Sequence, residues 1–146
     1  EKGNRIRMAL FTPPLTSLVV ALSTSVRNDI GCHHPPKSVY LNSLLNAMRT
    51  SRLLVYEHPL LILLINDKPI SEHSPDFIVH GQETLIVNLL VSPEITQADV
   101  NCVQACLDAH QRTANGVLIN FGDQRLTWMN IAQRQRKYYS RNRSTV

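Results

Sequence analysis

The sequence predicts an α/β fold, and three observations support this class. Two segments in the N-terminal third, 15–26 and 38–49, repeat their apolar residues at helical spacing. Two later segments, 84–91 and 116–121, are almost continuously apolar, as strands covered on both faces usually are. A third helical pattern, 96–113, lies between those two strands. The chain has 146 residues, of which 43% are hydrophobic, so one domain with a sizeable core is expected.

The first two predicted helices are separated by a break that contains Gly31 and two prolines. The first helix is predicted at 15–26. Pro14 just before it supports this start, because a proline suits a first helical turn, where its missing N–H is not needed. The second helix spans 38–49. The apolar stripes are Leu15, Leu18, Val19 and Leu22 in the first helix and Val39, Leu41, Leu44, Leu45 and Met48 in the second.

The middle of the chain is rich in Leu, Ile and Val and predicts strands. Segment 53–65 is broken once, by Pro59, and ends at 66–69, whose Asn-Asp-Lys-Pro sequence predicts a turn. Segments 77–79 and 84–91 follow it, and the loop 80–83 between them contains a glycine that suits a hairpin. These segments should form neighbouring strands of the central sheet.

The last third of the domain predicts a capped helix followed by a hairpin. Thr96 is the expected N-cap of helix 96–113, and Asp99, three residues later, resembles the second member of a capping box. The strand 116–121 is followed by a turn, and 126–131 is its expected hairpin partner.

The net charge of +4 is concentrated at the C-terminal end of the sequence. Five of the fifteen Lys and Arg residues lie in 133–146, which has no acid, and this leaves ten against eleven Asp and Glu elsewhere. We therefore divide the chain into an N-terminal extension (1–12), a domain (13–132) and a basic tail (133–146). We expect the tail to bind an anionic partner. Its candidate RNA- or anion-binding residues are Arg134, Arg136, Lys137, Tyr138, Tyr139, Arg141 and Arg143.

Several functional classes are excluded by composition. No apolar run approaches the roughly 20 residues that span a bilayer. Three cysteines without regular spacing argue against a disulfide-stapled secreted module, and the scattered glycines form no phosphate-binding loop. The sequence begins at Glu1 without a signal pattern, and we expect that a leader was removed or that further residues precede it.

One run of residues carries a family resemblance. Gly-Val-Leu-Ile-Asn-Phe-Gly at 116–122 closely resembles the Gly-Leu-Leu-Ile-Asn-Phe-Gly run of the bacterial GxxExxY proteins, a branch of the PD-(D/E)XK nuclease superfamily. Gly31 and Tyr40 look like the ends of the motif after which that branch is named. Segment 75–79 resembles the strand that carries the first metal-binding aspartate of the family. The resemblance covers roughly 15–131 and implies a mixed central sheet flanked by helices.

The same resemblance implies that the catalytic residues have been lost. Asp76 matches the family's aspartate, but Asn88 stands at the position of the metal-binding glutamate and Leu90 at that of the lysine. Mg²⁺ requires anionic oxygen ligands, and leucine cannot activate a water molecule. We therefore interpret Asp76, Asn88 and Leu90 as vestigial positions and predict no catalytic residue.

Two further positions of the family motif are also changed. The glutamate of the named motif becomes Lys37 or, since the spacing is one residue longer, Pro36. The glutamine of the later helix becomes Cys102 by the usual spacing, although Gln104 lies close by.

Rescue of the site by other residues is not expected. Glu83 and Glu94 lie five and six residues from Asn88, about 16–20 Å along an extended strand. Helix 96–113 contains no lysine that could replace the lost one. Asp76 then has a simpler explanation as a strand-edge or capping carboxylate.

Cys102, Cys106 and His110 recur every four residues and share one face of a helix. Zinc would need ligands at about 2.0–2.3 Å, but Cys102 and His110 are separated by about 12 Å of helical rise. At most two of the three could bind one ion, with Cys32 or its neighbouring histidines supplying the rest. The alternative is two buried thiols beside a half-exposed histidine, and we favour it over zinc and over a Cys–His nucleophile. No metal or cofactor is predicted.

We expect the protein to be a structural subunit of a large assembly, not an enzyme. The arginine-rich tail, the expected leader and the bacterial-type ancestor favour the mitochondrion, on its matrix side. The first candidate is the mitochondrial ribosome, with other protein subunits as partners and the tail on rRNA. The first alternative is an accessory subunit of a respiratory or ATP-synthase complex, where the tail would meet acidic protein or anionic lipid. The second alternative is a divergent metal-dependent nuclease with relocated ligands.

Overall fold

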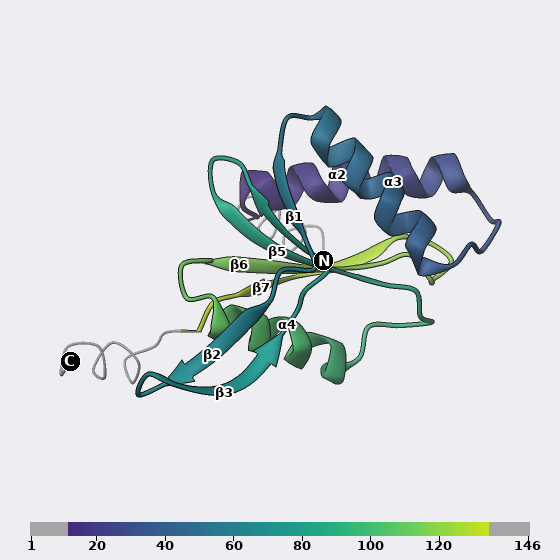
Figure 1. Cartoon of the computed structure of the whole chain (residues 1–146). Coiled ribbons are helices and arrows are strands. Elements are labelled where there is room, and N and C mark those ends of the chain that lie inside the picture. The colour runs from purple at the N-terminus through teal and green to yellow at the C-terminus, as the bar shows by residue number, and fades with distance from the viewer. Residues whose placement is uncertain (1–11, 135–146) are drawn as a thin grey trace.

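A five-stranded mixed sheet forms the centre of the structure, which is a computed structural model that describes residues 12–134 (Figure 1). Only the pair β5 and β6 is parallel, and the other neighbouring strands are antiparallel. The order across the sheet is β1 (Leu54–Glu57), β4 (Phe77–His80), β5 (Thr84–Leu90), β6 (Asn115–Asn120) and β7 (Thr127–Ala132).

Helices cover both faces of this sheet (Figure 1). On one face lie α2 (Pro14–Ile30) and α3 (Lys37–Thr50), and on the other lies α4 (Gln97–Ala109). A separate antiparallel hairpin, β2 (Leu61–Ile65) and β3 (Lys68–His73), lies beside α4. The predicted α/β class, with a mixed sheet between helices, is confirmed. No helix in this part of the chain is long and apolar enough to cross a membrane.

The segment predicted as 53–65 is two strands in different sheets, and the expected turn after it is shorter than predicted. The chain breaks at His58, which has a positive φ of 45° and is followed by a proline. Asn66 and Asp67, with φ values of 53° and 63°, make the turn between β2 and β3. β3 was not predicted, because Pro69 in a strand is unusual; it is tolerated here beside an irregularity in the β2–β3 register.

Local capping sets the ends of the last helix. The Thr96 hydroxyl accepts from the Asp99 backbone N–H at 3.3 Å, and the Asp99 carboxylate accepts from the Thr96 N–H at 2.8 Å. The predicted capping box is therefore confirmed. The helix stops at Ala109 rather than at residue 113, because His110 leaves the helical conformation and its N–H closes the last turn on Cys106.

The two central strands are buried on both faces, as their apolar runs predicted. Alternate residues of β5 and β6 point into two cores, one under α2 and α3 and one under α4. The first core includes Leu85, Val87, Leu89, Val117 and Ile119, and the second includes Ile86, Leu118 and Ile131 with Val103 and Leu107 of α4.

The run Gly116–Gly122 is held by close contacts that explain its composition. A Cβ at Gly116 would lie 2.6 Å from a methyl of Val103, so only glycine lets α4 approach β6 this closely. A Cβ at Gly122 would overlap the backbone of Ser92. The buried side chain of Asn120 fixes that same loop, because its amide donates to the Ser92 carbonyl at 2.9 Å and its oxygen accepts from the Gly122 N–H at 2.9 Å.

Phe121 joins this run to the second helix. Its ring is fully buried and stacks on Tyr40 of α3, with ring centroids 4.5 Å apart. Its backbone N–H donates to the Leu90 carbonyl at 2.8 Å. The C-terminal end of the run Gly116–Gly122 is thereby held both to α3 and to the end of β5, where the candidate site lies.

Candidate functional site

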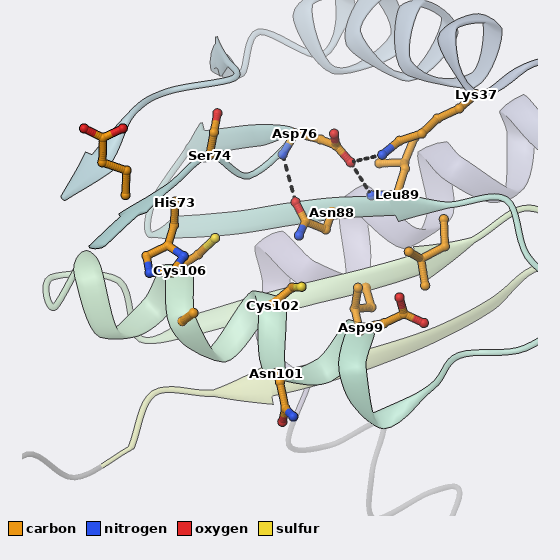
Figure 2. Close-up of a pocket in the computed structure, with 14 residues that line it drawn as sticks. Lys37, His73, Ser74, Asp76, Asn88, Leu89, Asp99, Asn101, Cys102 and Cys106 are labelled. Atoms are coloured by element: carbon orange, nitrogen blue, oxygen red, sulfur yellow. Dashed lines mark hydrogen bonds and ion pairs between the residues drawn. The ribbon is translucent and has the colours of Figure 1, made fainter. Parts of the chain in front are cut away.

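A pocket of about 530 Å³ lies between α4 and the ends of β4 and β5 (Figure 2). It receives side chains from elements that are far apart in the sequence: the start of α3, β3, the loop before β4, β5, α4 and β6. The structure brings together in this pocket the three positions that the resemblance indicated. It also places there one of the two candidates considered at each of the two further motif positions. The residues concerned are Asp76, Asn88 and Leu90, with Lys37 and Cys102.

Asp76 is buried, with 7% of its surface exposed, and one of its two carboxylate oxygens has two partners. One oxygen, Oδ2, accepts from the backbone N–H of Leu89 at 2.7 Å and lies 3.1 Å from Lys37 Nζ. Figure 2 shows both contacts converging on that oxygen. Asp76 therefore ties the loop before β4 to β5, which is the strand-edge role that the sequence suggested as the simpler explanation.

Lys37 supplies the positive charge beside this carboxylate. It is the first residue of α3, whose first turn has no acidic residue and whose N-cap, Pro36, makes no side-chain hydrogen bond. A cation at a helix N-terminus is unfavourable to the helix dipole, so helix stability does not explain a lysine there. The ion pair with Asp76 explains the lysine, because the Asp76 side chain is only 10% exposed and a buried carboxylate needs a counter-charge.

Asn88 and Leu90 make the neighbouring wall of the pocket neutral. The Asn88 side-chain oxygen accepts from the Asp76 backbone N–H at 2.8 Å, so it serves the same β4–β5 connection. Leu90 packs against the core under α4. Neither side chain carries a charge, and neither offers a metal ion the anionic oxygen that a hard cation requires.

Comparison with known proteins identifies the fold family. A family model described as the PD-(D/E)XK nuclease superfamily matches residues 13–131. The chain belongs to this superfamily. A solved structure described as "Crystal structure of SSO0001" is similar with a TM-score of 0.53 and 10% identity, over 75% of this chain and 55% of that one. At this identity the likeness shows the fold alone, and the chain spans little more than half of that structure. No curated protein matches the sequence.

The superfamily fold predicted from the resemblance is thus confirmed.

The structure also locates the residues that were considered as replacements for the missing catalytic side chains. The Glu83 carboxylate accepts from the Leu15 N–H at 2.9 Å, at the start of α2. Glu94 lines a neighbouring hollow instead of the pocket. Gln104 is buried and donates to Asp108, and it does not line the pocket, whereas Cys102 does.

Two carboxylates that sequence reasoning missed line the pocket of this superfamily member, Glu72 and Asp99. Glu72 comes from β3, and it could not be found because no strand was predicted between the turn at 66–69 and segment 77–79. Asp99 was recognised only as a cap, and its carboxylate does bond to the backbone and hydroxyl of Thr96. Within residues 12–134, no group of three or more His, Cys, Asp or Glu side chains could hold a metal ion.

The cysteine pair of α4 differs from its prediction. Cys106 is buried as expected, but Cys102, one turn nearer the N-terminus of α4, is exposed. Burial, with smaller effects of Cys102 and Asp76, raises the pKa of Cys106 to about 11. Its thiol is therefore protonated at neutral pH and a poor nucleophile.

Two other residues of the zinc alternative, His110 and Cys32, lie elsewhere. His110 is half-exposed, as predicted, and its ring bonds to the Thr113 hydroxyl at 2.5 Å. Burial lowers the pKa of His110. Cys32 is exposed and lines a different hollow, beside Arg27 and Arg125.

Of the predicted tail site, only Arg134 is within the described residues, and it is exposed. The other tail residues lie outside the part of the chain that the structure describes: Arg136, Lys137, Tyr138, Tyr139, Arg141 and Arg143.

Proposed function

We propose that this superfamily member does not cleave nucleic acids and acts as a non-catalytic subunit of a larger assembly. The observation that carries the first part is the Lys37 ammonium group 3.1 Å from Asp76. The resemblance implies that the aspartate at the position of Asp76 binds the catalytic metal ion in nucleases of this superfamily. Here the positive charge that balances the carboxylate is supplied by the chain itself.

A divalent ion bound to the Asp76 carboxylate would lie within a few Å of this ammonium group. At separations of a few Å, two cations repel strongly in a partly buried site. The ion would then find the amide of Asn88 and the methyl groups of Leu90 where the family has a carboxylate and a lysine. The site therefore lacks both the family's second anionic ligand for the metal ion and a side chain that could activate water, and we infer that it does not support hydrolysis.

We also propose that the chain belongs to the GxxExxY branch. The support is the contact between two segments that carry the resemblance. Tyr40, at the position of the motif tyrosine, stacks on Phe121 of the run Gly116–Gly122. The two segments therefore pack together as one structural unit in this chain.

The assembly that we propose is the mitochondrial ribosome, with the basic tail on rRNA. This proposal rests on the sequence of 133–146, which has five cations, two tyrosines and no acid. Arginine forks match phosphate oxygens, and tyrosine rings can stack on unpaired bases. The rest of the chain has no excess of basic residues, so the tail is the part suited to RNA.

A metal titration tests the loss of the catalytic site. The thermal midpoint of the protein should be the same in EDTA and in millimolar Mn²⁺, because a ligand raises the midpoint only if it binds the folded state. The matched control is Asp76→Asn, which removes the charge and keeps the shape. A Mn²⁺-dependent rise that disappears in Asp76→Asn would contradict the proposal.

A tail deletion tests the role in an assembly. Removing 135–146 should leave the domain folded and should reduce recovery with the native particle most strongly at low salt. Raising the salt should narrow the difference, because it weakens the phosphate contacts that only the full-length protein makes. The measurement is quantitative recovery of full-length and tail-deleted protein, together with rRNA, across a salt series. Equal recovery of both forms at every salt concentration would show that the folded domain does the docking.

A further inference from the structure

The pocket around Asp76 continues into a second hollow of about 440 Å³ beyond the end of β5. The two share Lys37, Leu89, Leu90 and Asp99, so together they form one groove between the N-terminal ends of α3 and α4. We call this the α4 groove. Its apolar surface includes Leu90, Ala105 and Val91, and Val91 is 43% exposed although it is a large hydrophobic residue.

The rim of the α4 groove is acidic. Lys37 is the only lysine or arginine among the described residues that line it, and its charge is balanced by Asp76. Three further carboxylates remain, those of Glu72, Glu94 and Asp99. Glu72 and Glu94 are exposed and form no ion pair within residues 12–134, while Asp99 caps its own helix. The groove is therefore negative in a chain whose net charge is +4.

We propose that the α4 groove binds a cationic, extended segment of a partner protein in which arginine or lysine alternates with apolar residues. Charge complementarity selects this occupant, since the rim would attract cations and would repel the backbone of a nucleic acid. The apolar floor would take the alternate side chains or the stem of an arginine. The inference rests on the proposed function, because a groove that still cleaved nucleic acid would have to accept a polyanion.

A peptide-binding experiment with the full-length protein tests this inference. The probe is a fluorescein-labelled peptide of alternating arginine and leucine, and the readout is fluorescence anisotropy. The wild type should bind it, and binding should weaken as salt is raised. The variant Glu72→Lys/Glu94→Lys should bind about tenfold more weakly or worse, because two rim charges are reversed.

The matched control is Asp29→Lys/Glu57→Lys, a pair of exposed charge reversals at the end of α2 and in β1, outside the groove. It should bind the peptide like the wild type. Thermal midpoints of both variants show that each is folded. Equal affinity of the rim variant and the wild type would overturn the inference, as would equal binding of a peptide with glutamate in place of arginine.

Two further outcomes identify other occupants and would also overturn it. If the peptide binds only after deletion of 135–146, the groove is filled by the chain's own tail. If a labelled single-stranded RNA oligonucleotide, added without the peptide, binds the wild type and loses that binding in Val91→Asp, the groove is a nucleic-acid site. Cleavage of the oligonucleotide is scored separately and bears on the proposed function, so the two failures can be told apart.

Discussion

Replacing Phe121 with alanine should lower the free energy of unfolding by about 3–5 kcal/mol. The ring is 1% exposed and stacks on Tyr40, so its removal leaves a cavity between the end of β6 and α3. The loss should exceed the transfer free energy of the ring alone, because the surrounding backbone is fixed. Asn120 and Gly122 on either side are held by hydrogen bonds and by close packing on Ser92.

Urea denaturation monitored by circular dichroism measures this change. The control is Met129→Ala on the edge strand β7, where the side chain is 42% exposed, and the expected loss is less than about 1 kcal/mol. If Phe121→Ala were no more destabilising than Met129→Ala, the contact between the two resemblance segments would not support the fold.

Replacing Lys37 with glutamate should both destabilise the protein and create a response to metal. The substitution places a second carboxylate beside Asp76 and removes its ammonium partner. Loss of one member of a buried pair is costly, but the Lys37 side chain is 44% exposed and solvent screens the change, so we expect about 1–3 kcal/mol. Millimolar Mn²⁺ should restore part of this loss by bridging the two carboxylates.

Thermal midpoints in EDTA and in Mn²⁺ test this result for three proteins. The wild type should be insensitive to Mn²⁺, Lys37→Glu should be stabilised by it, and Lys37→Gln should be destabilised without a metal response. If Lys37→Glu were as stable as the wild type and equally insensitive to Mn²⁺, the ammonium group would not be the counter-charge of Asp76.

Much of the fold could be predicted because the apolar pattern alone distinguishes its elements. The helices, the strands β5 and β6 and the capping box at Thr96 all follow from periodicity and local chemistry. The hairpin strand β3 could not be predicted, since it contains Pro69 and few apolar residues. It is held by pairing with β2 and by its position beside α4, which are tertiary effects.

The site could be predicted as a set of positions but not as a set of contacts. The resemblance indicated Asp76, Asn88 and Leu90, and it left the choice between Lys37 and Pro36 open. The ion pair of Lys37 with Asp76 depends on how the start of α3 meets the loop before β4, which no local pattern encodes. The exposure of Cys102 was missed for a similar reason. Helical spacing shows which residues share a face, but it does not show how far along the helix that face is buried by other elements.

The central claim is that the site no longer supports metal-dependent hydrolysis, and a cleavage assay tests it most directly. Purified protein would be incubated with single- and double-stranded DNA and with RNA, in Mg²⁺ or Mn²⁺, beside a parallel preparation of Asp76→Ala. Our account predicts that the wild type cuts none of these substrates faster than the variant does. Metal-dependent cleavage that is abolished by Asp76→Ala would contradict it.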